Sequence, residues 1–232
     1  MKSRKPSISI IIPTYHEAGN IGEMVKRTKK LSQLYSLEII VVDGGSKDGT
    51  PDIAEKAGAT KVIRFPSKRG KGLDLWEAFQ VAKGDYIIEI DADLQFDPEQ
   101  VPLFMRAFQE GADVVIARRE NYKESPLWRT IGNKSLSLLT SLVLMYPIQD
   151  VLAGFKAAKK NVMLSLQLQE KGFMYESEIV VKAVRMNYKL VQIPVRYKRR
   201  MRENSQVSLI KDGLRFARSI IYFGLIVPPP SK

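Results

Sequence analysis

The chain has 232 residues, of which 44% are hydrophobic and none is cysteine, with 37 Lys and Arg against 25 Asp and Glu. This composition excludes a disordered chain, a disulfide-bonded scaffold and a thiolate metal site, and the length suits one α/β domain with at most a short appendage. Residues 182–232 carry 12 basic and 2 acidic side chains, so a nearly neutral body precedes a basic tail, which predicts a polyanionic partner.

The first half of the chain alternates short β-branched runs with segments of helical spacing. The runs lie at residues 7–12, 38–42, 61–65, 86–90 and 113–117. This alternation predicts an α/β domain with a mostly parallel, doubly wound sheet, and runs without polar alternation fit strands that are covered on both faces. In such sheets ligands bind outside the carboxyl ends of the strands, so we expect functional residues there.

The second half is less regular. Its spacing predicts a helix over residues 127–144, a glycine-containing turn at residues 153–155 and a helix near residues 177–186. A strand over residues 189–197 is expected next, followed by a basic, polar loop over residues 198–208.

The sequence Asp91-Ala92-Asp93-Leu94-Gln95 follows the fourth run. If the strand geometry persists, residues two apart point the same way about 7 Å apart, so Asp91, Asp93 and Gln95 converge at the ligand-binding edge. Two close carboxylates at neutral pH require a cation, and oxygen ligands without Cys or His favour Mg²⁺ or Mn²⁺. The alternative is a helix cap followed by a solvated acidic turn.

Asp43 closes the second run and is followed by Gly44 and Gly45. Glycines at this place allow a ligand to approach the backbone closely, although the spacing matches neither a dinucleotide fingerprint nor a P-loop. A tight strand-to-helix turn is the alternative. His16 is the only histidine, and without a serine elbow it favours a loop residue over a catalytic triad or a zinc ligand.

Six blocks occur in an order that is characteristic of one family. They are Pro13-Thr14-Tyr15 with Glu17; Asp43 with Asp48-Gly49-Thr50; Gly70-Lys71-Gly72; Asp91 to Gln95 with Pro98-Glu99; Asp150 with Gly154-Phe155; and Lys171-Gly172-Phe173 with Glu178. Together, over about residues 7–208, they resemble family 2 glycosyltransferases, and among these the dolichyl-phosphate mannose synthases. The resemblance implies a GT-A fold, a nucleotide-sugar donor, and Mn²⁺ or Mg²⁺ bridging the donor diphosphate to the residues of the Asp91 block.

The resemblance also implies roles for individual residues. It places donor-nucleotide binding on Pro13, Tyr15, Glu17, Asp43, Lys71, Asp91 and Ala92, and metal binding on Asp91, Asp93 and Gln95. It places catalysis on Asp93, Arg119, Arg129 and Arg200, and the acceptor phosphate on Arg119, Arg129, Asn133, Arg200 and Ser205. The chain departs from the family pattern at His16, Gly44, Asn133, Glu203 and Gln206. The last three of these departures concern the acceptor, and none of the five touches the metal block.

We therefore expect an inverting glycosyltransferase that moves a hexose, mannose from GDP-mannose, onto a dolichyl or polyprenyl phosphate. The alternatives are a UDP-glucose-dependent enzyme acting on the same lipid and a family 2 transferase with a soluble phosphorylated acceptor. A nucleic-acid-binding module is disfavoured because apolar residues at helical spacing interrupt the basic tail, and because the acidic block repels a phosphate backbone. No nucleic-acid partner is expected.

We expect residues 1–208 to form the catalytic domain and residues 209–232 a basic amphipathic helix. On that helix Lys211, Arg215 and Arg218 share one stripe, and Leu209, Phe216, Ile220 and Phe223 lie on the opposite side. Its apolar end is far shorter than the ~20 residues of a membrane span, which predicts peripheral attachment at the cytoplasmic face of a membrane, with the need for a separate membrane subunit left open. The alternative is that the same apolar side packs on the catalytic body.

Overall fold

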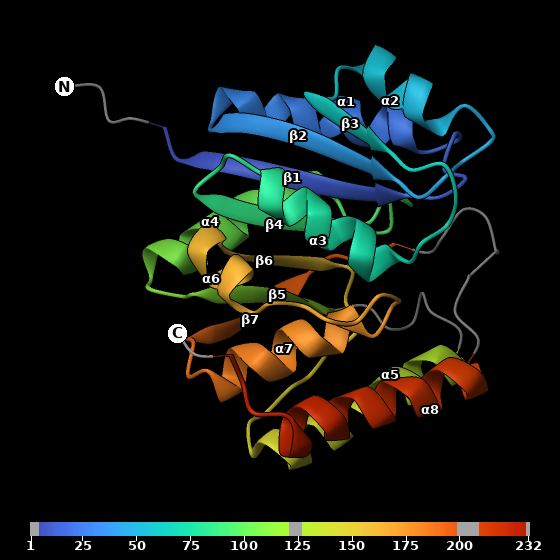
Figure 1. Cartoon of the computed structure of the whole chain (residues 1–232). Coiled ribbons are helices and arrows are strands. Elements are labelled where there is room, and N and C mark those ends of the chain that lie inside the picture. Colours follow the sequence, from blue (N-terminus) through green and yellow to red (C-terminus); the bar gives the residue numbers. More distant parts are fainter. Residues whose placement is uncertain (1–4, 121–126, 199–208, 231–232) are drawn as a thin grey trace.

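The computed structural model describes residues 5–120, 127–198 and 209–230, with the side chains of residues 129 and 209–211 outside this description (Figure 1). Its strands form one sheet in the order β3-β2-β1-β4-β6-β5-β7. They are β1 (Ser7–Thr14), β2 (Ser36–Asp43), β3 (Lys61–Arg64), β4 (Tyr86–Ile90), β5 (Val114–Arg119), β6 (Phe155–Lys159) and β7 (Leu190–Val195).

The sheet is parallel except at β6. β1 pairs in parallel with β2 and β4, and β5 pairs in parallel with β7, whereas β6 lies antiparallel between β4 and β5. The expected doubly wound, mostly parallel sheet is thus confirmed. β6 was not predicted, because its sequence FKAAK has none of the β-branched residues that mark a strand.

Helices cover both faces of the sheet (Figure 1). They are α1 (Ile21–Lys29), α2 (Thr50–Ala57), α3 (Lys71–Val81), α4 (Val101–Gln109), α5 (Leu127–Leu144), α6 (Lys160–Ser165), α7 (Tyr175–Arg185) and α8 (Leu209–Ile221), with short turns η1 (Lys30–Gln33) and η2 (Pro98–Gln100) and a π-helical turn η4 (Tyr222–Ile226). Ile10 packs in the core cluster that contains Phe104 of α4, while its neighbour Ile11 packs in the cluster of Phe79 of α3. Alternate residues of the central strand therefore fill opposite layers.

The C-terminal helix lies beside α5 (Figure 1). Phe216, Ile220 and Phe223 are 3%, 0% and 4% exposed. Ile220 and Phe223 form a third cluster with Val181 of α7, and Leu139 of α5 packs against it. The apolar side of this helix thus packs on the body, as in the alternative stated above. Among the described helices, none combines the length and the apolar character that crossing a membrane requires.

Candidate active site

A cleft of about 740 Å³ opens at the carboxyl ends of the central strands, where a doubly wound sheet binds its ligands. Side chains from α3, α5, α7 and α8 complete it. The predicted site residues that line it are Pro13, Tyr15, Glu17, Lys71, Asp91, Ala92, Asp93, Gln95, Arg119 and Asn133. Arg200 and Ser205 lie outside the described residues, as does the side chain of Arg129.

Asp43 is buried at the end of β2 and does not line the cleft. Its carboxylate accepts hydrogen bonds from the backbone N–H groups of Gly45 and Ser46, at 3.1 and 2.8 Å. The hydroxyls of Ser46 and Thr14 donate to it at 2.6 and 3.0 Å. Asp43 therefore shapes the turn that carries Gly44 to the cleft wall, and its contact with a nucleoside stays a prediction.

The predicted metal residues lie on the turn that follows β4. The strand ends at Ile90, and Leu94 has a φ of +61°, so this segment is not extended as the sequence analysis assumed. Asp93 Oδ1 accepts a hydrogen bond from the Gln95 N–H at 3.1 Å, which closes the turn. Asp91, Asp93 and Gln95 nevertheless all face the same cleft.

Gly154 defines the position of Asp91. The Asp91 N–H donates to the Gly154 carbonyl at 3.0 Å. A Cβ atom at residue 154 would lie 1.9 Å from Asp91 Oδ2, far inside van der Waals contact. Only glycine leaves room for the Asp91 carboxylate in its observed place.

Substituting this glycine tests that constraint. In Gly154→Ala the methyl group displaces the Asp91 carboxylate, so we expect sugar transfer to fall by about a hundredfold. The free energy of unfolding should decrease by only about 1–3 kcal/mol. Gly213→Ala is the control, because its Cβ atom meets nothing within 4 Å although Gly213 lines the same cleft. Equal activity of the two variants, measured as kcat/KM, would contradict the role of Gly154.

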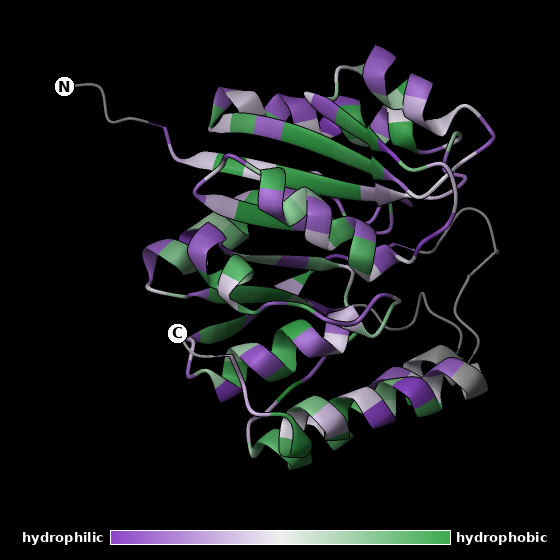
Figure 2. Cartoon of the chain, in the orientation of Figure 1, coloured by the Kyte–Doolittle hydropathy of each residue, from purple (hydrophilic) through white to green (hydrophobic). Residues whose placement is uncertain are grey.

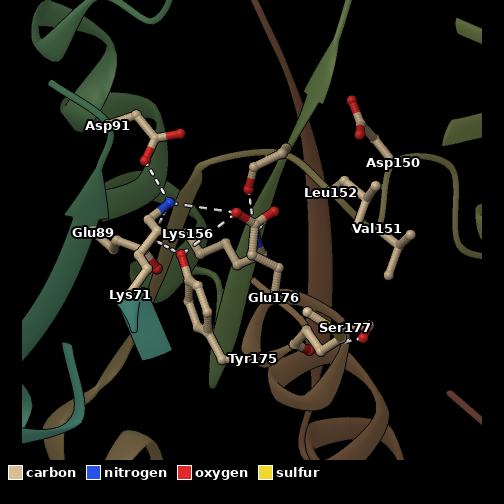
Figure 3. A network of polar contacts seen from close by, with 12 residues as sticks. Lys71, Glu89, Asp91, Asp150, Val151, Leu152, Lys156, Tyr175, Glu176 and Ser177 are labelled. Atoms are coloured by element: carbon tan, nitrogen blue, oxygen red, sulfur yellow. Dashed lines mark hydrogen bonds and ion pairs between the residues drawn. The ribbon is translucent and has the colours of Figure 1, made fainter. Parts of the chain in front are cut away.

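Behind Asp91 lies a buried network of charged side chains, the Lys71 network (Figure 3). Lys71 Nζ lies 2.6 Å from Asp91 Oδ1, 3.4 Å from Glu176 Oε1 and 3.5 Å from Glu89 Oε1. Lys156, which is fully buried, lies 3.5 Å from the other carboxylate oxygen of Glu176. The hydroxyl of Tyr175 donates to Glu89. The network joins α3, β4, β6 and α7 beneath the cleft.

The electrostatics of this network keep Lys71 charged. Burial by itself lowers the pKa of Lys71, but the carboxylates of Asp91, Glu176 and Glu89 outweigh it and raise that pKa well above its usual range. Burial raises the pKa of Glu89, against the opposing effect of Lys71 and Lys156. The charged ammonium group of Lys71 therefore stabilises the carboxylate of Asp91.

Sequence reasoning missed Glu89, Lys156, Tyr175 and Glu176 as parts of the site. Glu89 and Lys156 are single charged residues inside otherwise apolar strands, at YIIEI and FKAAK. A charge in a strand that is covered on both faces needs a partner, since an unpaired buried charge is costly. That signal could have identified Glu89 and Lys156 as candidates, but not Tyr175 and Glu176, which contact them.

A second buried group organises the opposite side of the cleft. Asp150, which is fully buried, accepts hydrogen bonds from the backbone N–H, Nε and Nη2 of Arg119 at 3.1, 2.9 and 3.0 Å. It also accepts one from Asn133 Nδ2 at 2.9 Å. Arg119 and Asn133, which were predicted separately, are thus brought together by one carboxylate and held in a fixed orientation.

The oxygen atoms after β4 fit a shared divalent cation. Two carboxylates and one amide suit Mg²⁺ or Mn²⁺, which prefer oxygen ligands. Within the described ranges no group of three or more Asp, Glu, His or Cys side chains could hold a metal ion by itself. A cation at Asp91, Asp93 and Gln95 would therefore take its remaining ligands from a bound anion, as Mg²⁺ does with phosphates.

One family model and two curated relatives match most of the chain, and all three are glycosyltransferases. The family model for glycosyl transferase family 2 matches residues 9–164. The chain is 32% identical over 212 residues to a dolichol-phosphate mannosyltransferase of Pyrococcus furiosus, covering 86% of this chain and 59% of that protein. It is 27% identical to the low-salt glycan biosynthesis hexosyltransferase Agl6 of Haloferax volcanii, covering 93% and 53%. The chain thus spans a little over half the length of these two relatives.

Solved structures resemble the fold at lower identity. Glucosyl-3-phosphoglycerate synthase of Mycobacterium tuberculosis, in complex with phosphoglyceric acid, superposes with a TM-score of 0.79 at 22% identity, covering 96% of this chain and 81% of that chain. The same enzyme in complex with Mn²⁺, UDP and phosphoglyceric acid gives a TM-score of 0.76 at 22% identity, covering 96% and 80%. At this identity the likeness concerns the fold.

Proposed function

The chain belongs to glycosyltransferase family 2 and has its GT-A fold, and we propose that it transfers mannose from GDP-mannose to dolichyl or another polyprenyl phosphate. One observation carries the proposal: the turn of residues 91–95, the Asp91 turn, lines the same cleft as Arg119 and Asn133. The first suits a metal-bound diphosphate and the second an acceptor phosphate. The similarity to the Pyrococcus mannosyltransferase supports this choice of donor and acceptor.

Separate residues of the cleft would bind the donor and the acceptor. Asp91, Asp93 and Gln95 would hold Mn²⁺ or Mg²⁺, which when bound stabilises negative charge on the departing diphosphate. Arg119, oriented by Asp150, would attract the acceptor phosphate and place it in line with the anomeric carbon.

The chain needs no dedicated base for this reaction, because the acceptor phosphate is already ionised at pH 7. A phosphate oxygen forms the new bond to the anomeric carbon while the bond to the diphosphate breaks, and the electron pair leaves with the diphosphate. A single displacement of this kind inverts the α configuration of the donor to a β-linked product.

The apolar part of the cleft favours a lipid over a small soluble acceptor. Trp128 and Ile131 of α5, with Phe216 of α8, line the same cleft as the polar residues. A lipid phosphate requires an anion site next to an apolar surface, whereas a small phosphorylated acid requires polar groups throughout. The soluble acceptor stays the second candidate, because the structural neighbour is named as a glucosyl-3-phosphoglycerate synthase.

A substrate matrix tests the function. GDP-mannose, UDP-glucose and UDP-N-acetylglucosamine are each offered with dolichyl phosphate or with 3-phosphoglycerate, in Mn²⁺ or in EDTA, and radiolabelled product is measured. We expect transfer from GDP-mannose to the lipid in Mn²⁺ only. Transfer only to 3-phosphoglycerate would contradict the lipid acceptor, and transfer only from UDP-glucose would contradict the donor.

We further propose that α5 and α8 face a membrane surface. Large apolar side chains on these helices and on η4 are exposed even though the opposite side of α8 is packed. Figure 2 shows that hydrophobic and hydrophilic residues alternate along both helices. This outer surface comprises Leu127, Ile131, Leu138 and Leu142 of α5 with Met145 directly after it, and Leu214, Ile221, Leu225 and Ile226 of α8 and η4. Many exposed apolar side chains on two neighbouring helices are typical of an interaction site. The exposed Arg215 and Arg218 could add attraction to anionic lipid.

Leu138→Asp combined with Leu214→Asp is expected to weaken binding to vesicles of phosphatidylcholine and phosphatidylserine by at least about tenfold, since each leucine would no longer enter the interface. The melting temperature should stay within about 2 °C, because both side chains are more than 60% exposed. Leu103→Asp on α4, also exposed, is the control and should bind normally. Unchanged vesicle sedimentation of the double variant would contradict this surface.

A further inference from the structure

Tyr197 follows β7 and contacts both sides of the cleft. Its hydroxyl accepts a hydrogen bond from Gln95 Nε2 at 2.5 Å, and its ring lies 5.2 Å from the guanidinium of Arg119. The side chain is only 7% exposed and packs at its ring edge against Phe96. One buried aromatic residue therefore touches a proposed metal ligand and a proposed acceptor-phosphate residue.

The backbone next to Tyr197 fixes the same glutamine. Gln95 Nε2 also donates to the Lys198 carbonyl at 3.2 Å, and the Lys198 N–H donates to the Gln95 carbonyl at 2.8 Å. A backbone carbonyl can only accept a hydrogen bond, so the amide nitrogen of Gln95 must face Lys198. The amide oxygen is then on the other edge of the planar group, on a side chain that lines the cleft.

Gln95 is not predisposed to this orientation by itself. An amide side chain can turn by 180° and present its NH₂ group, which repels a cation, in place of its oxygen. The Lys198 carbonyl removes that freedom, because the flipped amide would place its oxygen against a group that can only accept. The Tyr197 hydroxyl accepts from the same Nε2 and so anchors the amide in the orientation that the carbonyl selects. Groups that orient a ligand in this way commonly account for a large part of metal affinity.

We propose that Tyr197 is a positioning residue that holds the amide of Gln95 in the orientation in which its oxygen is presented to the divalent cation. This inference rests on the proposed metal-dependent function and assigns a role to a residue that the sequence analysis did not single out. The hydroxyl acts on Gln95, while the ring supports Arg119 independently. Removing the hydroxyl alone should therefore affect metal binding without disturbing the acceptor side.

Tyr197→Phe removes the hydroxyl and keeps the ring. With GDP present, and with UDP in a second series, we expect the Kd for Mn²⁺, measured from the electron paramagnetic resonance signal of free Mn²⁺, to rise about tenfold. Nucleotide affinity in EDTA should not change. Tyr146→Phe is the matched control, because it removes a hydroxyl that donates to the Leu190 carbonyl outside the cleft.

A double-mutant cycle with Gln95→Ala separates positioning from general destabilisation. If Tyr197 acts through Gln95, Tyr197→Phe causes no further loss of Mn²⁺ affinity in the Gln95→Ala background. Equal Mn²⁺ affinity of Tyr197→Phe and the wild type, or an equal loss in both backgrounds, would overturn the inference alone. A wild-type protein that binds nucleotide but no Mn²⁺ would overturn the proposed metal dependence, and this inference with it.

Discussion

Replacing Asp93 with alanine is expected to lower kcat/KM for sugar transfer by about 10³-fold, equivalent to about 4 kcal/mol of transition-state stabilisation. Asp93 belongs to the Asp91 turn that lines the cleft, where a cation would be shared with the donor diphosphate. Without this carboxylate the cation loses an anionic oxygen ligand. Nucleotide binding in EDTA should change little, because it does not depend on the metal.

Stability must be separated from catalysis in this experiment, because Asp93 Oδ1 also accepts the Gln95 N–H. The loss of that hydrogen bond costs about 1 kcal/mol. Asp93→Asn keeps an oxygen acceptor for the turn while removing the charge, so it should fold like the wild type and still be inactive. Asp52→Ala, at an exposed side chain of α2 that pairs with Arg64, is the control. Near-normal turnover of Asp93→Asn, or wild-type activity that survives EDTA, would contradict the metal site.

Replacing Lys156 with methionine is expected to reduce the free energy of unfolding by about 3–5 kcal/mol. Methionine has a similar length, but it removes the buried cation that lies 3.5 Å from Glu176. Lys71 would then be the remaining cation of the Lys71 network for the carboxylates of Glu89, Asp91 and Glu176. A buried carboxylate without its partner is costly, and urea denaturation measures that cost.

The same strand provides the control for this experiment. Lys159 ends β6 and pairs with Asp113 at 2.7 Å, but it is 36% exposed, so Lys159→Met should cost less than about 1 kcal/mol. Adding Glu176→Gln to Lys156→Met should recover part of the lost stability, because it removes a carboxylate charge that lost its partner. Unchanged stability of Lys156→Met would contradict the electrostatic balance of the network.

The sequence by itself determined the parallel strands, the family and ten of the residues that line the cleft. The runs of Ile and Val predict β1 to β4 because strands covered on both faces carry an uninterrupted apolar pattern. The Asp91 block and Lys71 were predicted because each lies in a short contiguous motif at a strand end or a helix start. Such strand patterns and short motifs involve residues close together in the chain, so they can be recognised in a single sequence.

Only the tertiary structure decided how distant residues combine. Asp150 joins Arg119 and Asn133 across 31 and 17 residues, and Lys71 reaches Glu176 across 105. The antiparallel insertion of β6 brings Lys156 beneath the cleft, although its sequence carries little strand signal.

The position of the C-terminal helix was also decided by the tertiary structure. Its amphipathic pattern favoured a membrane interface, with a packed helix as the alternative. Ile220 and Phe223 pack inward because α5 and α7 provide a matching apolar surface, and Phe216 on the same side is also buried. The pattern specifies which side of a helix is apolar, whereas the partner that buries that side depends on the positions of other elements, which only the folded chain defines.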